Sequence, residues 1–377
     1  MTTLRVVVDH LVHENPGGIG RYTEELTKQL IATAPGGCDV EAIISLVPPD
    51  EVESIRRLLP GARITKLPLA RRELAFAFQT GLFVPNMRGM IHSPSLLAPL
   101  GKHDRVTDGD QVTATIHDTL PWTHPESLTT TNVHWTKSMA KRALKFADAV
   151  IVPSHAVADQ LQDIMDFGDR IRVVGGAPAT TLQIPADANE RAARLDLPER
   201  FVLTMGTIGP RKGVRALIQA MALPEAAGLP LLIAGPDRWG DESATGIAAA
   251  AGLPEDRVRP LGRLEDADLA VLFDRAEVFV YPSLAEGFGL PIVEAFRFGT
   301  PVIHSDDPAQ MEVSDGAGVA VERAPSAGYP QRLAEAVGQV VGDGRTAARL
   351  RVLSADRARA FSWRDSAERI WQLHADL

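Results

Sequence analysis

Apolar runs of strand length alternate with amphipathic segments of helix length from one end of the chain to the other. Strands that are apolar on both faces are typical of a parallel sheet covered by helices on both sides. The runs lie at residues 4–8, 40–46, 62–66, 90–92, 112–116 and 149–152, and again at residues 201–205, 231–234, 258–261, 278–281, 301–304 and 318–321. The alternation therefore predicts an α/β fold with two doubly wound parallel sheets.

The chain has 377 residues, of which 45% are hydrophobic. This length is enough for about two domains. Residues 175–188 are rich in Gly, Pro and Ala without helical or strand periodicity, which is typical of a linker. We therefore predict one domain at residues 1–178 and a second at residues 179–360. Two such domains would leave a cleft facing the carboxyl ends of both sheets, where ligands of these folds bind.

Charge and cysteine content restrict the class of protein. There are 39 basic and 48 acidic residues, a formal charge of -9, which argues against a nucleic-acid-binding protein. Cys38 is the only cysteine, so a disulfide framework is excluded and a reducing cytoplasm is expected. No 18 apolar residues run together, and the N-terminus becomes polar too early for a secretion signal. These features predict a cytoplasmic protein.

Residues 277–300 predict a strand, a glycine-rich loop and a helix with Pro291 in its first turn. Gly287 and Gly289 would let the backbone approach a ligand, and the first-turn amides of the helix lack intrahelical partners. Glu286 lies in the loop and Glu294 about one turn into the helix. Two acceptor carboxylates beside donor amides suit a polyhydroxylated ligand that carries phosphate. The alternative is a solvated loop acid and an ordinary glutamate near a helix start.

Residues 206–213, G-T-I-G-P-R-K-G, form a second glycine-rich turn between a strand and a helical pattern. Arg211 offers a planar fork and Lys212 a compact charge, so the pair could clamp a diphosphate. The order of residues differs from that of a Walker loop. The alternative is two surface cations beside a turn.

Two further stretches of the first half carry candidate residues. Gly17 and Gly18 precede a helical pattern, too far beyond the strand at 4–8 for a dinucleotide fingerprint. His117 closes the strand at 112–116 and would lie at the mouth of the cleft, where it could donate to a sugar hydroxyl. A tight turn and a structural histidine are the alternatives. Ser154 is expected to cap the helix that follows the strand at 149–152.

Three motifs resemble those of retaining glycosyltransferases of family 4, which have the GT-B fold. They are E-G-F-G-L-P-x-x-E-A at residues 286–295, G-x-x-x-x-R-K-G at 206–213, and H-D-x-x-P-x-x-x-P-E at 117–126, the last typical of mannosyltransferase-like members. The resemblance implies two Rossmann-like domains, with the acceptor side at 1–178, the donor side at 179–360, and a terminal helix at 361–377 that packs back on the first domain. Residues 305–315 match the family's P-E-V-x-G segment only loosely.

The resemblance also implies the reaction. A hexosyl group, with mannosyl favoured, would pass from a nucleotide diphosphate sugar such as GDP-mannose to a hydroxyl of a glycan, lipid-linked or small-molecule acceptor, with retention of configuration. The diphosphate would be neutralised by cations and helix N-termini, so neither a cofactor nor a metal is expected. The implied catalytic residues are His117, Arg211, Lys212 and Glu286. The implied donor-binding residues are Gly17, Gly18, Gly206, Gly209, Arg211, Lys212, Glu286, Gly287, Phe288, Gly289, Leu290 and Glu294, with Glu286 on the sugar and Glu294 on the ribose.

Other functions fit parts of the pattern. A nucleotide-sugar epimerase of the same fold would need no acceptor, a non-catalytic nucleotide-sugar binding protein would show no turnover, and a dehydrogenase would bind a nicotinamide cofactor. Two acidic triplets, at 108–110 and 266–268, are interpreted as a turn and an exposed helix start rather than metal sites. Lys137, Lys141 and Lys145 share a helical face, which is either solvated or touches an anionic bilayer at the inner membrane face.

Overall fold

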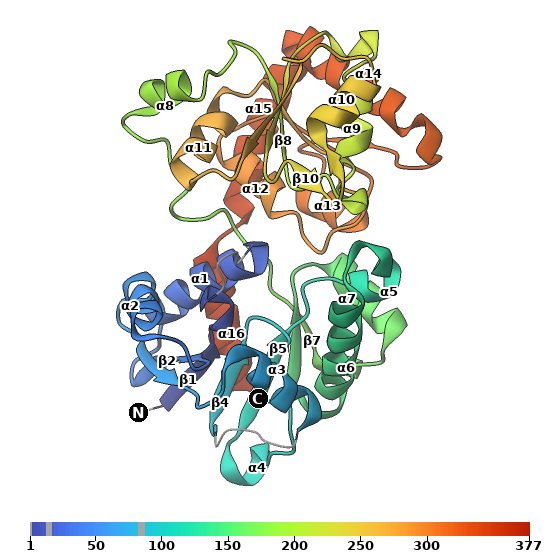
Figure 1. The fold of residues 1–377 in the computed structure, drawn as a ribbon. Helices are drawn as coiled ribbons and strands as arrows, with labels where there is room; N and C mark the ends of the chain where they lie inside the picture. The colour runs from blue at the N-terminus through green and yellow to red at the C-terminus, as the bar shows by residue number, and fades with distance from the viewer. Residues whose placement is uncertain (1, 13–16, 82–86) are drawn as a thin grey trace. The chain divides into compact units, whose positions relative to one another are not determined.

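The computed structural model describes residues 2–12, 17–81 and 87–377. The chain divides into two compact units (Figure 1). The first unit comprises the chain up to Gly176 together with Ser362–Leu377, and the second unit is Ala177–Phe361. The division lies between residues 176 and 177, where the sequence placed it between 178 and 179. Within the described residues, no helix is long and apolar enough to cross a membrane.

The first unit contains a parallel seven-stranded sheet in the order β3-β2-β1-β4-β5-β6-β7. Its strands are β1 (Thr2–Val7), β2 (Cys38–Ile44), β3 (Arg63–Lys66), β4 (Met90–Ser93), β5 (Gln111–Thr115), β6 (Ala149–Val152) and β7 (Ile171–Val173). The six predicted strands are confirmed to within two residues at either end. β7 was not predicted, because this edge strand has three residues and a central, exposed Arg172.

Helices of the first unit cover its sheet (Figure 1). They are α1 (Gly17–Ala32), α2 (Pro49–Leu58), α3 (Arg71–Thr80), α4 (Arg105–Asp108), α5 (Leu120–Thr123), α6 (Thr130–Phe146), α7 (His155–Ile164) and α16 (Trp363–Asp376). The C-terminal α16 packs on α1, and the indole nitrogen of Trp371 donates to the carbonyl of Leu30 at 3.1 Å. Ser154 caps α7 as predicted, accepting a hydrogen bond from the amide of Val157 at 3.2 Å.

The second unit contains a parallel six-stranded sheet in the order β12-β9-β8-β13-β14-β15. The strands are β8 (Val202–Met205), β9 (Leu231–Ala234), β12 (Val258–Gly262), β13 (Val278–Tyr281), β14 (Val302–Ser305) and β15 (Val319–Val321). All six were predicted. Val278 and Val280 of β13 enter one apolar cluster, and Phe279 and Tyr281 enter the cluster on the opposite face. This alternation explains why the central strands are apolar at every position.

Helices of the second unit pack on both faces of its sheet. They are α8 (Ala188–Arg194), α9 (Val214–Ala220), α10 (Ala244–Ala250), α11 (Asp266–Arg275), α12 (Leu290–Arg297), α13 (Pro308–Ser314), α14 (Tyr329–Gly342) and α15 (Gly344–Arg357). A small antiparallel hairpin, β10 (Arg238–Trp239) and β11 (Glu242–Ser243), was not predicted. Its two-residue strands are too short to show periodicity. Residues 175–187 contain neither helix nor strand, whereas residue 188, the last of the predicted linker, begins α8.

Candidate active site

The predicted residues of the second unit lie in two loops that leave neighbouring strands. β8 leads into residues 206–213 and β13 into residues 282–289. Because β8 and β13 pair in parallel, their carboxyl ends meet at one edge of the sheet. The amide of Leu284 donates to the carbonyl of Arg211 at 2.7 Å, and Ser283 Oγ lies 3.3 Å from the same oxygen. The two loops are therefore joined directly.

Gly213 permits this close approach. Its φ is +66°, and a Cβ atom there would lie 2.0 Å from the carbonyl oxygen of Pro282. An L-residue would be strained by the positive φ and would also collide with the second loop. The predicted Gly206 also has a positive φ, +130°, and lies against the side chain of Lys212. The glycines of this turn thus serve the packing of the two loops as well as any ligand.

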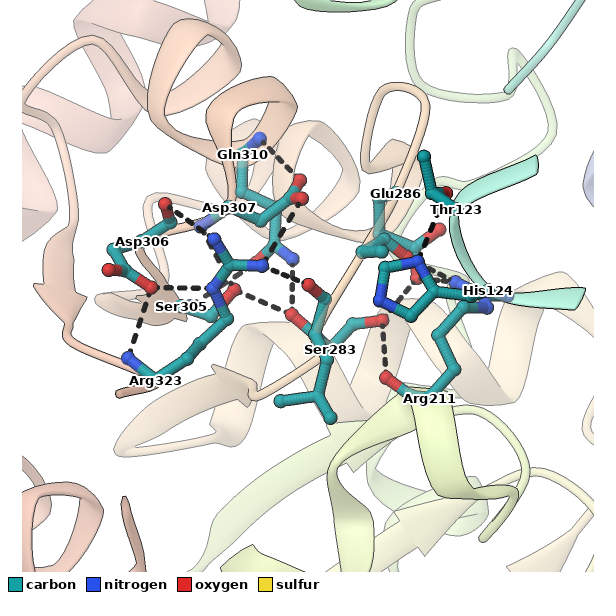
Figure 2. A network of polar contacts seen from close by, with 12 residues as sticks. Thr123, His124, Arg211, Ser283, Glu286, Ser305, Asp306, Asp307, Gln310 and Arg323 are labelled. Carbon is teal, nitrogen blue, oxygen red and sulfur yellow. Dashed lines mark hydrogen bonds and ion pairs between the residues drawn. The ribbon is translucent and has the colours of Figure 1, made fainter. Parts of the chain in front are cut away.

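Glu286 lies at the centre of what we call the carboxylate cluster, which consists of Glu286, Arg211, Lys212, Tyr281 and Ser283. Its Oε1 atom lies 2.6 Å from Lys212 Nζ and 2.9 Å from Arg211 Nη1. The same atom accepts hydrogen bonds from the hydroxyls of Ser283, at 2.6 Å, and Tyr281, at 2.8 Å. Figure 2 shows Glu286 between Arg211 and Ser283. All of these contacts reach Oε1, so Oε2 takes part in none of them.

The carboxylate cluster keeps Glu286 ionised. Burial alone would raise its pKa, but the charges of Lys212 and Arg211 and the hydrogen bonds of Lys212 and Ser283 outweigh burial and lower the pKa to about 2. Burial and the charge of Glu286 raise the pKa of Tyr281 well above its ordinary value, so the phenol stays a neutral donor. Two cations and one carboxylate leave a net positive charge in the cluster.

The β14–α13 corner supports the loop that carries Glu286. The hydroxyl of Ser305 donates to the carbonyl of Ser283 at 2.5 Å, and the side-chain amide of Gln310 donates to the same carbonyl at 2.8 Å. Ser305 and Gln310 are both fully buried. These contacts (Figure 2) hold the backbone three residues before Glu286. Ser305 and Gln310 both lie within residues 305–315, the segment that matches the P-E-V-x-G pattern only loosely.

Arg323, which follows β15, binds the same loop from a different direction (Figure 2). Its guanidinium donates to the carbonyl of Leu284 and, at 2.6 Å, to Asp306 Oδ1. Asp307 caps α13 beside it, and burial raises the pKa of this carboxyl to about 6 although Arg323 opposes the effect. Arg323 carries no signal in the sequence, because its partners lie 17 and 39 residues away and the intervening chain gives no periodic pattern.

The loop before α12 holds the other predicted donor-binding residues. Gly289 precedes the helix with a φ of +104°, and Pro291 lies in the first turn, as predicted. The ring of Phe288 packs edge-on against Phe361 at 5.9 Å between centroids. Glu294 is only 3% exposed, one turn into α12. The donor-binding roles of Gly206, Gly209, Gly287, Phe288, Gly289, Leu290 and Glu294 stay predictions.

The remaining predicted residues lie in the first unit. Gly17 and Gly18 are exposed at the start of α1, and Tyr22 follows them by about one turn. The His117 ring lies edge-on to Tyr22, 4.8 Å between centroids, and its Nε2 is 2.7 Å from the carbonyl of Pro94. Nε2 must therefore carry the proton. Burial lowers the pKa of His117 to about 4, so the neutral ring offers Nδ1 as an acceptor. Donation by His117 to a sugar hydroxyl would need the other tautomer.

The acidic triplets have structural partners. The carboxylate of Asp110 accepts from the amide of Gly89 at 2.5 Å. Asp266 and Asp268 start α11, but the expected exposure of this helix start is wrong for Asp268, which is buried and pairs with Arg191 at 2.8 Å and Arg194 at 2.7 Å. In the described part of the chain, no group of three or more His, Cys, Asp or Glu could hold a metal ion.

On α6, Lys141 and Lys145 are exposed and Lys137 is half-buried. Their contact with a bilayer stays a prediction.

Two sequence families match the chain. Residues 16–177 match the family described as Glycosyltransferase Family 4, and residues 186–352 match that described as Glycosyl transferases group 1. The O-antigen chain mannosyltransferase B of Escherichia coli is 28% identical over 335 residues, which cover 81% of this chain and 83% of the relative. A serotype-specific mannosyltransferase of Escherichia coli is 32% identical over 178 residues, 44% of this chain but 22% of that protein.

Solved structures agree with these matches at the level of the fold. Sucrose-phosphate synthase from Thermosynechococcus elongatus has a TM-score of 0.74 and 23% identity, covering 100% of this chain and 99% of that one. The Anabaena protein HepE, solved in complex with UDP-glucose, has a TM-score of 0.74 and 20% identity over the whole of both chains. The two family matches and the named relatives show an enzyme that transfers glycosyl groups. The chain belongs to glycosyltransferase family 4 and has the GT-B fold.

Proposed function

We propose that this glycosyltransferase moves a hexosyl group, with mannosyl favoured, from a nucleotide diphosphate sugar to an acceptor hydroxyl, with retention of configuration and without a metal ion. The observation that carries the proposal is the carboxylate cluster. There, Arg211 and Lys212 of one loop meet an ionised Glu286 of another at the carboxyl edge of a parallel sheet. Such an edge is where doubly wound folds bind nucleotides.

The relatives support the choice of donor and acceptor. The Escherichia coli proteins are named as mannosyltransferases, one of them acting on O-antigen chains, and the Anabaena structure holds UDP-glucose. We extend this to a nucleotide diphosphate donor, GDP-mannose first, and a saccharide acceptor that is free or lipid-linked. We further propose that the reaction takes place in the cytoplasm.

In this mechanism Arg211 and Lys212 stabilise the leaving diphosphate. The bond between the anomeric carbon and the phosphate oxygen breaks, and its electron pair stays on the phosphate. Arg211 has five N–H donors and Lys212 three, so both retain donors beyond their contact with Glu286. Charge that grows on the phosphate as the bond breaks is then met by cations already in place. Loss of one such donor typically lowers turnover about 10²- to 10³-fold.

Glu286 has the properties of a sugar-binding acceptor rather than of a covalent nucleophile. Its pKa of about 2, the three hydrogen bonds to Oε1 and the ion pair with Arg211 make the carboxylate weakly nucleophilic. Oε2 remains to accept a hydrogen bond from a hydroxyl of the donor sugar. We therefore favour attack by the acceptor oxygen on the face from which the diphosphate departs, with the acceptor proton passing to the leaving phosphate.

Calorimetric titration of the purified protein with GDP, UDP, ADP and their hexose forms, with and without chelator, tests this proposal. We expect one nucleotide to bind regardless of chelator, and Lys212→Ala to abolish most of the binding. With the donor identified, the anomeric configuration of the product can be followed by nuclear magnetic resonance. Lys212→Ala with near-normal turnover would contradict the mechanism. A free, isomerised nucleotide sugar as product would favour the epimerase, and saturable binding without turnover on any acceptor would favour a binding protein.

A further inference from the structure

A single tryptophan of the second unit lies beside the loop that carries Arg211 and Lys212. The chain has five tryptophans, and only Trp239 falls within residues 177–361. Trp239 lies on β10 (Figure 1) and is 43% exposed. A Cβ atom on Gly209 would lie 3.2 Å from both Cδ2 and Cε3 of the indole. The indole therefore packs on a glycine that precedes Arg211 by two positions, and much of its surface stays open.

Contacts at both ends hold the hairpin that carries Trp239. The amide of Ala244 donates to the carbonyl and to Oδ1 of Asp237, both at 3.2 Å. Trp239 pairs with Glu242 across the hairpin, and Glu242 forms an ion pair with Arg215 of α9. The exposed indole is therefore placed by its surroundings and does not merely project from a loop tip.

The order of the strands relates Trp239 to the proposed donor site. The sheet runs β9-β8-β13, and all three strands are parallel. Glu286 follows β13, the cations Arg211 and Lys212 follow β8, and Trp239 follows β9. Along this edge the chain therefore places an acceptor for a sugar, a pair of cations for a diphosphate and an aromatic surface, in that order. A nucleotide diphosphate sugar has its sugar, diphosphate and nucleoside in the same order.

We propose that Trp239 is the stacking surface for the nucleobase of the donor. The inference rests on the proposed function and adds a base-binding residue to it. Every nucleobase has a π-face, so stacking contributes affinity without choosing strongly among bases. The open part of the indole is available for this contact, while its Cδ2 and Cε3 atoms pack on Gly209. Groups on other loops must then select the base.

The test compares ligands with and without a base. Wild type, Trp239→Ala and Trp239→Phe are titrated with the nucleoside diphosphate that the wild type binds and with inorganic pyrophosphate. We expect Trp239→Ala to weaken nucleotide binding about 5- to 150-fold, to leave pyrophosphate binding unchanged, and Trp239→Phe to retain most of the affinity. The nucleotide should also quench tryptophan emission in the wild type and not in Trp239→Phe, whereas pyrophosphate should quench neither.

The alternative outcomes separate this proposal from the proposed function. Equal nucleotide affinity in all three proteins would overturn the role of Trp239, while Lys212-dependent binding would still support the glycosyltransferase donor site. Equal weakening of nucleotide and pyrophosphate would also overturn it, because Trp239 would then act only by supporting the Gly209 turn. No nucleotide binding by the wild type would refute both.

Discussion

Replacing Glu286 with Gln tests the carboxylate cluster most directly. The substitution keeps the shape of the side chain but removes its charge. Arg211 and Lys212 would then face each other without the negative charge that Glu286 Oε1, 2.9 Å and 2.6 Å from them, now carries. The side chain of Glu286 is only 12% exposed, so water would compensate little.

The pKa of Glu286 sets the size of the effect. A pKa lowered from 4.5 to about 2 corresponds to about 3 kcal/mol of stabilisation by the ionised form. Because the folded-state pKa lies below the unfolded one, this stabilisation is complete above pH 4.5 and is lost as pH falls toward 2. Breaking a buried ion pair typically costs about 3–5 kcal/mol, which agrees. We therefore expect Glu286→Gln to lower the free energy of unfolding by about 3 kcal/mol at pH 7.

Equilibrium urea unfolding of four proteins gives the assay: wild type, Glu286→Gln, Lys212→Met and the double variant. The two single changes should be non-additive by about 1–3 kcal/mol, since they remove the same contact. Glu242→Gln is the matched control, because its ion pair with Arg215 is exposed and should be worth less than about 1 kcal/mol. Additive effects, or a Glu286→Gln variant as stable as Glu242→Gln, would refute the reasoning.

Three further predictions follow from single contacts. Gly213→Ala should destabilise the protein by at least about 2 kcal/mol more than Gly240→Ala in thermal unfolding. The two glycines have similar φ values, +66° and +59°, but of the two only Gly213 faces a carbonyl oxygen. Equal shifts in melting temperature would contradict the predicted clash. Burial lowers the pKa of His374 from 6.5 to about 4, so the free energy of unfolding should fall by about 3 kcal/mol as pH drops from 6.5 to 4. His374→Gln should flatten that part of the curve of unfolding free energy against pH. An unchanged slope would show that His374 is not the source of the pH dependence. Arg323→Ala should lower kcat about tenfold, because the backbone at Leu284 would lose its anchor. A change in the free energy of unfolding with kcat unchanged would assign Arg323 a purely structural role.

The sheets were predictable because burial on both faces leaves an unbroken apolar run. β9 and β13 begin and end at the predicted residues, and β6 does so as well. The short elements were not predictable. β7 is an edge strand with a polar residue at its centre, and β10 and β11 depend on pairing with each other rather than on a pattern within either. Local sequence does not record such pairing.

The candidate site was predictable loop by loop, but not as an arrangement. Sequence indicated that Arg211, Lys212 and Glu286 belong to glycine-rich loops at strand ends. It assigned the cations to a diphosphate and the carboxylate to a sugar, but it gave no sign that Lys212 contacts Glu286 across 74 residues of chain or that Arg211 pairs with the same oxygen. The apolar pattern marks Tyr281 only as the last residue of a strand and gives no signal for Ser283, although both donate to Glu286. Contacts between loops depend on strand order, which the apolar pattern leaves open.

The position of Glu286 bears on how the proposed diphosphate site keeps its two cations together. Two cations that converge on one point repel each other, and in an empty site they would turn apart toward water. A carboxylate between them holds both side chains at 2.6–2.9 Å from a single oxygen, at the cost of one unit of the positive charge that would attract the ligand. In the proposed reaction, fixed positions for Arg211 and Lys212 favour catalysis even though one positive charge is neutralised. Donors that are in place before the bond breaks need no reorganisation as charge develops on the phosphate. Glu286→Gln should then reduce kcat more than it weakens binding of the ground-state nucleotide, whereas a carboxylate that served only to bind sugar would change the two together.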